Sequence, residues 1–412
     1  MRKIFYCFFI FCCVNTWSQD LEIYEGNQQG NYKTRLLELN ANEHPILKGF
    51  TEKAAIYHQI GYYNKAIYNY KKALELGSID AIQLKLAQSY HAAGMAKEAI
   101  NLYEGVFVKD SSNLMVASRL ARLYSSTRKK KQAVKLYQYL IKNDPSNPYY
   151  SYRLAKIFKK QGRFYASGEL FLETFKKDSA HISSIFELAK FYKLLRFKDS
   201  TELFIDKGLA LNRTHLNFLQ MKASFLYKHK RYKESIRYCN MLDSLRFSNA
   251  TVSSLKGACF EKMNQLDSAQ VYYGKAVRMD KTSMDYAFKL ANIYHKNKNP
   301  KQAKLILMIA LFGAEPDFSA PQFLYATIYQ EEGKLKEAIL YFKKSYQSGT
   351  RFYKGLFQWA VTSEAYYKDK KIAFDLYVKY IERFESKDLV LTKYAKQRIK
   401  IIRKTLFLKG EI

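Results

Sequence analysis

The chain has 412 residues, of which 48% are hydrophobic and only 26% are charged, and this composition excludes an intrinsically disordered protein. Glycine and proline are scarce, at 17 and 6 residues, which argues against a turn-rich β protein and favours helices. The formal net charge of +32 bears on solubility and on partners rather than on the fold.

The first 18 residues have the layout of a secretory signal peptide. Arg2 and Lys3 precede an apolar run over residues 4–14, and the small residues Thr16 and Ser18 suit cleavage after Ser18. The run is much shorter than the roughly 20 residues that a membrane-spanning helix needs, although an uncleaved anchor is an alternative. We therefore expect an exported chain.

Beyond this segment only two of the five cysteines remain, Cys239 and Cys259. Two cysteines do not make a disulfide scaffold, but an oxidising compartment permits a single bridge. A pair of buried free thiols is the simpler interpretation, and the bridge stays open as the alternative.

Small residues recur at a nearly constant spacing from residue 54 onward. Along the first row the step from Ala87 onward is 34 residues, with a last step of 35 before Ala326, and the second row has steps of 33 to 35. An aromatic residue usually follows three residues after a member of the first row, or four after a member of the second. The first row is Ala54, Ala87, Ala121, Ala155, Ala189, Ala223, Gly257, Ala291 and Ala326, and the second is Ala66, Ala99, Ala133, Ser167, Thr201, Ser235, Ala269, Ala303, Ala338 and Ala373.

These spacings predict two helices in every unit. Residues three or four apart share a helix face, so each helix carries a small residue, which lets a neighbouring helix approach closely, beside a large one. Four glycines at the link between the helices suit a positive φ, and Pro145 can stop the helix before it. The link glycines are Gly61, Gly94, Gly162 and Gly333, and other units have Arg128, Arg196, Lys230, Asn264 or Lys298 at the link.

The pattern resembles the tetratricopeptide repeat family, most closely in GYYNKAIYNYKKALEL at residues 61–76. The resemblance implies an all-α fold, a right-handed superhelical α-solenoid of about ten tandem 34-residue helix-turn-helix repeats over residues 45–384. Stacking then supplies the core that one unit lacks. Residues 19–44 form a lead-in with one short helix near residues 32–39, and residues 385–412 form a C-terminal capping helix.

By this resemblance the first helix of each unit lines a concave groove. In units three to five the groove positions are mainly basic and aromatic, and Glu187 is the main acidic residue nearby. Such a surface suits an acidic peptide or a chain's C-terminal carboxylate, whereas a solvated lysine face is the alternative. The candidate groove residues are Arg122, Lys156, Lys159, Lys190, Lys193, Tyr149, Tyr152 and Phe186.

A second candidate site is the apolar stretch LILMIALF at residues 305–312. Met308, Ile309 and Phe312 fall on the side of a second helix that is polar in other units. Either another segment covers these residues, or they form a convex apolar interface for a partner or for self-association.

Signs of catalysis are absent from the sequence. No Gly-rich phosphate loop, HExxH or CxxC motif occurs. His58 and His91 occupy equivalent positions in neighbouring units, but no third ligand is near them in the pattern. We predict a protein that is not an enzyme and has no metal or cofactor.

The leading hypothesis is an exported, non-enzymatic scaffold that binds an acidic protein or peptide through the groove. The resemblance to exported repeat proteins indicates a bacterial chain, in the periplasm or outside the cell. The alternative is binding of a polyanion, such as an anionic glycan or lipid head groups, driven by the positive charge and including peripheral contact with an anionic membrane surface. Export argues against nucleic acid as the natural ligand.

Overall fold

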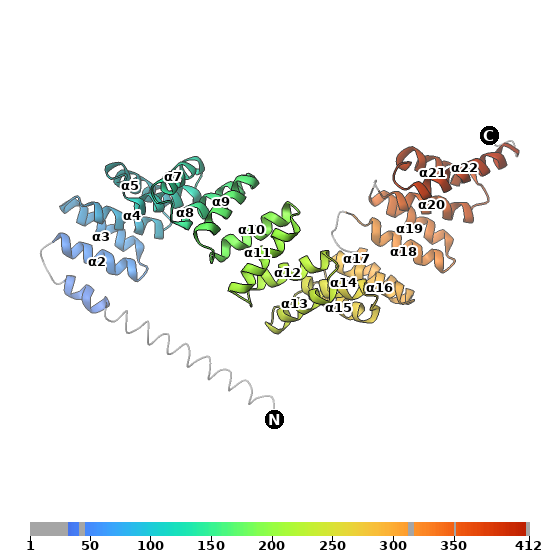
Figure 1. Cartoon of the computed structure of the whole chain (residues 1–412), viewed down its shortest axis with the longest axis horizontal. Helices are drawn as coiled ribbons and strands as arrows, with labels where there is room; N and C mark the ends of the chain where they lie inside the picture. Colours follow the sequence, from blue (N-terminus) through green and yellow to red (C-terminus); the bar gives the residue numbers. More distant parts are fainter. Residues whose placement is uncertain (1–31, 41–45, 312–316, 350–351, 409–412) are drawn as a thin grey trace, which may run out of the picture. The chain divides into compact units, whose positions relative to one another are not determined.

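The computed structural model describes residues 32–40, 46–311, 317–349 and 352–408, without the side chain of Ile309 (Figure 1). Within these ranges every regular element is a helix, and no strand occurs. A helix over residues 32–40 occupies the part of the lead-in where the sequence predicts one. The predicted signal peptide, with its cleavage after Ser18, lies outside the described residues.

The chain divides into two compact units, Met1–Thr201 and Glu202–Ile412. The helices of the first unit, up to the helix in which the division falls, are α2 (Leu47–Gln59), α3 (Tyr63–Leu76), α4 (Asp80–Ala92), α5 (Ala96–Lys109), α6 (Leu114–Ser126), α7 (Lys130–Asn143), α8 (Pro148–Lys160), α9 (Phe164–Lys177), α10 (Ile182–Leu194) and α11 (Lys198–Leu211). Those of the second unit are α12 (Leu216–Lys228), α13 (Tyr232–Ser244), α14 (Ala250–Lys262), α15 (Leu266–Met279), α16 (Met284–Lys296), α17 (Pro300–Leu311), α18 (Ser319–Glu331), α19 (Leu335–Ser348), α20 (Tyr353–Tyr366), α21 (Lys371–Phe384) and α22 (Leu389–Leu408).

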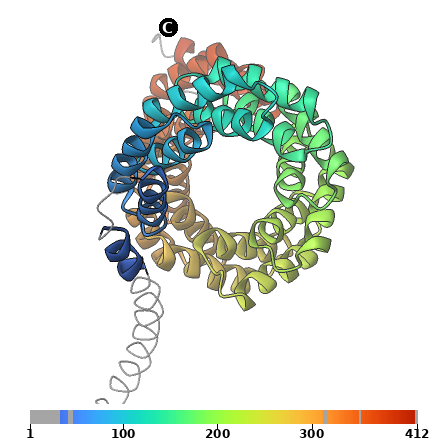
Figure 2. The ribbon, with the colours of Figure 1, turned by 90° about the vertical axis from the view of Figure 1, so that its left-hand side faces the viewer.

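In the described part of the chain, α2 to α21 form ten successive helix pairs, each joined by a short link. Within each unit consecutive pairs pack side by side, and their first and second helices form two rows (Figure 2). The last helix, α22, packs against α21 in the segment predicted to cap the chain. The fold is therefore the all-α solenoid of stacked helix pairs that the sequence predicts.

The small residues lie where helices cross. Ala121 and Ala155 have no exposed surface, and Ser167 is buried. Fully buried aromatic side chains fill the space beside the small residues of the second row; examples are Tyr103, Tyr137, Tyr273 and Tyr377. Because a single pair cannot bury these faces, the core forms only between neighbouring pairs.

The links confirm the role predicted for the glycines and add a feature that the sequence does not reveal. Gly61, Gly94, Gly162 and Gly333 have φ values of 84°, 78°, 75° and 74°. Arg196, Lys230, Asn264 and Lys298 adopt the same left-handed conformation, with φ between 55° and 62°, although side chains with a Cβ atom disfavour it. Arg128 is the exception: it is not among the residues with positive φ, and α6 ends in an extended residue, Thr127.

Candidate functional site

The candidate groove residues lie on α6, α8 and α10, the first helices of three successive pairs. Each helix places its small residue, Ala121, Ala155 or Ala189, in the core, where it has no exposed surface. The next residue in the sequence then points away from the core, because one residue advances a helix by about 100°. Arg122, Lys156 and Lys190 are accordingly exposed, and so is Lys193.

Aromatic rings on the same helices lie beneath these cations. The Lys156 ammonium lies 5.6 Å from the centre of the Tyr152 ring, and the Lys190 ammonium lies 5.3 Å from the centre of the Phe186 ring. The Arg153 guanidinium lies 5.7 Å from the Tyr149 ring. Each pair is four residues apart, so one helix holds both partners. The ammonium groups keep N–H groups that can donate hydrogen bonds to a carboxylate.

Lys159 differs from the other basic residues because it is paired. Its Nζ donates to Glu187, whose side chain is mostly buried at the contact between α8 and α10. Glu187 is the main acidic residue that the sequence predicts near the basic positions, and in the structure it pairs with Lys159. Arg122, Lys156, Lys190 and Lys193 make no ion pair within the described part of the chain, so we name these four residues the basic surface.

A pocket of about 230 Å³ adjoins the basic surface. Its apolar wall consists of Phe164, Phe171, Phe191 and Leu194, and Lys190 lies at its edge. The remaining lining residues are Lys159, Ser167, Gly168 and Glu187.

Gly168 shapes this pocket by its lack of a side chain. A Cβ atom at residue 168 would lie 2.4 Å from the Phe191 ring, a distance that van der Waals contact forbids. The Phe191 ring can therefore pack directly over α9, and it forms one wall of the pocket.

The apolar rim of this pocket was not predicted from the sequence. Phe164 is 50% exposed and Leu194 is 61% exposed, so both can contact a ligand at the pocket. A signal was available, because Phe164 and Tyr165 stand together at the start of a second helix, directly after a link. These two residues lie on a second helix, whereas the groove positions predicted from the sequence all lie on first helices.

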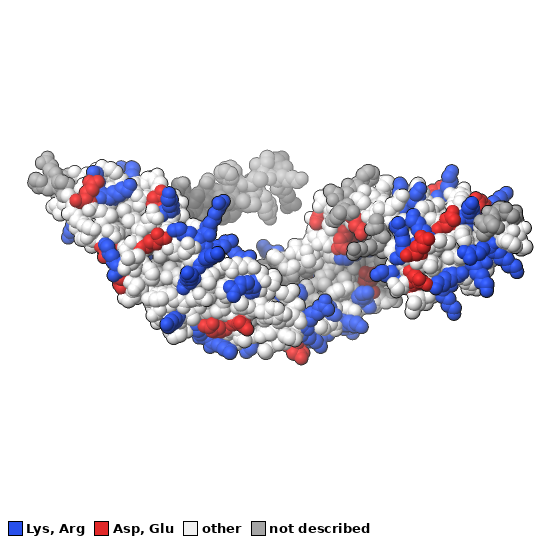
Figure 3. Space-filling model, turned by 90° about the horizontal axis from the view of Figure 1, so that it is seen from above, with Lys and Arg blue, Asp and Glu red and all other residues white. Residues whose placement is uncertain are grey.

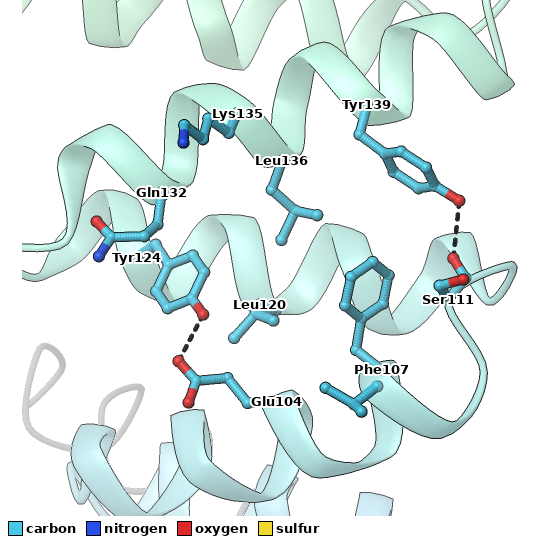
Figure 4. A pocket seen from close by; sticks show the side chains of 10 residues that line it. Glu104, Phe107, Ser111, Leu120, Tyr124, Gln132, Lys135, Leu136 and Tyr139 are labelled. Carbon is cyan, nitrogen blue, oxygen red and sulfur yellow. Dashed lines mark hydrogen bonds between the residues drawn. The ribbon is translucent and has the colours of Figure 1, made fainter.

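A second pocket of about 490 Å³ lies between α5, α6 and α7 (Figure 4). Phe107, Leu120 and Leu136 form its apolar floor. Tyr124 Oη donates to Glu104 at 2.5 Å, and Tyr139 Oη donates to the carbonyl oxygen of Ser111 at 2.8 Å.

Glu104, Tyr124 and Tyr139 at this second pocket already have partners inside the molecule. Burial opposes ionisation of Glu104, but hydrogen bonds from Tyr124 and Lys129 outweigh it and hold the pKa of Glu104 below its ordinary value. Figure 4 shows the Tyr124 and Tyr139 hydroxyls turned toward Glu104 and Ser111. Of the two charged side chains that line this pocket, Glu104 is therefore paired, whereas Lys135 makes no ion pair within the described residues.

The predicted convex apolar site is only partly described. Met308 is 47% exposed on α17, and its neighbour Leu305 is also exposed. The Ile309 side chain and all of Phe312 lie outside the described residues. The prediction that these three residues form an interface therefore stays untested.

The histidines do not form a metal site in the described part of the chain, where no group of three potential ligands occurs. His58 is half-buried, and its Nδ1 lies 2.9 Å from the Ser89 hydroxyl. Burial, together with the positive charges of Arg122 and Arg119, lowers the pKa of His91.

The two remaining cysteines are buried free thiols in the structure. Burial raises the pKa of Cys239 to about 12 and also raises the pKa of Cys259. Such thiols do not form the reactive thiolate at neutral pH.

Among the described helices, none combines the length and the apolar character needed to cross a bilayer.

Ten helix pairs with two rows of small residues define a helical-repeat protein. Two models of the tetratricopeptide repeat family match the chain, one over residues 118–180 and the other over residues 47–76 and 321–348. The matched segments carry the same small and aromatic positions as the rest of the solenoid. The chain therefore contains tetratricopeptide repeats, and the repeats of this family are typically non-catalytic.

Several solved structures resemble the chain at low sequence identity. A tetratricopeptide repeat protein from Parabacteroides merdae is 14% identical and covers 64% of this chain and 98% of its own, with a TM-score of 0.42. Pseudomonas aeruginosa pilF is 18% identical over 50% of this chain and 94% of its own, with a TM-score of 0.41. The human IFIT1 dimer with PPP-AAAA is 15% identical over 90% of this chain and 94% of its own, with a TM-score of 0.45. Because every TM-score is below 0.5, no functional conclusion follows from these similarities. No curated protein matches the sequence.

Proposed function

We propose that this protein is an exported, non-enzymatic scaffold that binds an acidic segment of a protein partner. The tetratricopeptide repeat fold supports a role in protein interaction, since stacked repeats present extended binding surfaces. The partner would lie across α6, α8 and α10, with carboxylates on the basic surface and one apolar side chain in the pocket between α8, α9 and α10.

One observation carries this proposal: cations that make no ion pair within the described residues stand beside an apolar pocket. Lys190 contributes to both features, because it is exposed on the basic surface and lines the pocket with Phe191 and Leu194. Carboxylates accept charge-assisted hydrogen bonds from ammonium groups, and apolar burial adds free energy that salt does not screen. A ligand with both kinds of group would use the whole site.

The alternative proposal is that overall charge drives binding of a polyanion. Binding of a polyphosphate or sulfated glycan would weaken steeply with salt, because it rests on release of counterions. A peptide held partly by the pocket would lose less affinity between 50 mM and 500 mM salt. A salt titration therefore separates the two proposals.

The experiment uses a set of synthetic peptides that contain two or three Asp or Glu residues around one Phe or Leu. We expect micromolar binding by the wild-type protein. Charge reversal of Lys156, Lys190 and Lys193 together should lower affinity at least tenfold, because each charge-assisted bond contributes about 1.5–3 kcal/mol. The matched control reverses Lys142, Lys160 and Lys176, which are exposed on helices of the same unit.

A second arm tests the apolar pocket. Phe164→Ser should weaken binding of the peptides that contain Phe or Leu, but not of the matched peptides with Ala at that position. Val108→Ser changes an exposed residue of the other pocket and should have no effect. Equal losses in the two charge-reversed triple variants, or no dependence on the apolar residue, would contradict the proposal.

A further inference from the structure

The C-terminal helix α22 has one face in the core and one face in solvent. Thr392, Ala395, Ile402 and Leu406 are buried against the last helix pair. The opposite face carries Lys393, Lys400 and Lys404, which are spaced by seven and four residues and therefore lie in one line along the helix. Nothing in the described part of the chain covers this line of lysines.

The exposed face of α22 is basic without compensation. Residues 389–408 contain six Lys or Arg residues and no Asp or Glu. Three of the six contact other residues of the chain. Lys396 pairs with Glu385 at 2.5 Å and Arg398 pairs with Glu364, while Arg403 lies over the Phe374 ring. Lys393, Lys400 and Lys404 make no ion pair within the described residues, and Figure 3 shows blue side chains gathered at the end of the molecule where α22 lies.

Large apolar side chains accompany these lysines. Ile401 is 43% exposed, Phe407 is 72% exposed and Leu408 is 75% exposed. Phe407 and Leu408 follow Lys404 by three and four residues, so they continue the same face. At these exposures much of the surface of each side chain is open to solvent.

We propose that this face of α22 binds an anionic lipid surface, with the helix lying in the plane of the head groups. A basic helix with projecting apolar side chains has the two groups that such a surface accepts, since cations meet the head groups while apolar side chains enter the acyl boundary. Lysine stems can lie along the apolar layer with their ammonium groups in the head-group region.

The charge distribution argues against the other occupants. A second copy of α22 would bring two uncompensated basic faces together, which Coulomb repulsion opposes. An acidic protein would satisfy the lysines, but the projecting side chains of Phe407 and Leu408 would need a cavity in that protein. A fluid lipid surface needs no such matched shape.

The test measures co-sedimentation of the protein with vesicles of phosphatidylcholine alone or with 30% phosphatidylglycerol. Only the anionic vesicles should bind it. Replacing Lys393, Lys400 and Lys404 together by Gln should lower the affinity on the order of 100-fold, since each cation near such a surface contributes about fivefold. The matched control replaces Lys301, Lys336 and Lys368, which are exposed elsewhere in the same unit, by Gln and should lower it less than fivefold.

A second readout detects insertion of the apolar side chains. In a Phe407→Trp variant, tryptophan emission should shift to shorter wavelength on anionic vesicles, and Phe407→Ser with Leu408→Ser should make binding far more sensitive to salt. Equal effects of the two lysine triples would show that net charge alone is responsible and would overturn the proposal. Absence of vesicle binding would also overturn it, and binding of an acidic protein by the same lysines would then identify that class of partner.

Discussion

Ser167 donates a hydrogen bond from its Oγ to the carbonyl oxygen of Ala155, 2.8 Å away, where α9 crosses α8. The same bond recurs two repeats further along the chain, from Ser235 Oγ to the Ala223 carbonyl oxygen, also at 2.8 Å. All four residues are buried. The bond joins the two rows of small residues, so a hydroxyl can replace a methyl group at the crossing without being left unsatisfied.

Substitutions at Ser167 should separate the hydrogen bond from the size limit. Ser167→Ala should cost about 1 kcal/mol or less, because the Ala155 carbonyl keeps its helical partner. Ser167→Leu should cost about 3 kcal/mol, since the larger side chain forces the two helices apart. Urea unfolding followed by circular dichroism measures both effects.

Ser183→Leu is the control for the size effect, because Ser183 is exposed on a helix of the same unit. It should change stability by less than about 0.5 kcal/mol. A similar cost at both positions would mean that helix crossing does not limit residue 167.

The same substitution should have opposite effects at two glycines of the first unit. Gly162 has a φ of 75°, and nothing lies within 4 Å of an added Cβ, so Gly162→Ala should destabilise by about 1 kcal/mol through backbone strain alone. Gly105 lies inside α5 with equal space around it, so Gly105→Ala should stabilise by about 1 kcal/mol through helix propensity. Changes of the same sign in the urea midpoint would refute this explanation.

Acid should weaken the second unit through Glu202. Burial opposes the ionisation of this carboxyl group, but hydrogen bonds from Lys222 and Arg231 outweigh it and hold its pKa below the ordinary value of 4.5. A lowered native pKa contributes stability above the unfolded value, and that contribution is lost as the pH falls through the native pKa. The urea midpoint should therefore fall between pH 5 and pH 3.

Glu202→Gln should reduce this loss, because the amide does not titrate. The exposed Glu382 makes no ion pair within the described residues, so Glu382→Gln should leave the pH dependence close to that of the wild type. A Glu202→Gln profile that runs parallel to the wild-type profile would rule out this carboxyl group as a source.

The two thiols should be inert in the folded protein. Burial raises the pKa of Cys239 to about 12, and Cys259 is also fully buried, so almost no thiolate is present at pH 8. A chain without residues 1–18 should show no reaction with Ellman's reagent until urea unfolds it, and should then release two equivalents. Rapid reaction of the native protein would contradict the buried placement of these thiols.

The periodicity of the sequence specifies the repeat and hence the fold. Rows of residues such as Ala121 and Ala155 specify where helices cross, and the link glycines specify where the chain turns, because both are local demands of size and backbone conformation. The family matches over residues 118–180 agree with this periodicity. Exposure of Lys156 and Lys190 also follows, since each stands next to a buried alanine.

Which side chains meet across helices depends on how neighbouring repeats pack, and this is seen in the folded chain alone. The tertiary structure pairs Lys159 with Glu187, places Phe164 and Leu194 at one pocket, and gives Lys404 on α22 no ion pair within the described residues. Lys159 and Glu187 are 28 residues apart, and Phe164 and Leu194 are 30 apart, so each pair meets only when neighbouring repeats pack together. The spacing of a repeat does not specify which charged or aromatic side chain the neighbouring repeat supplies. For that reason periodicity predicts the scaffold, whereas the binding surfaces depend on packing between units.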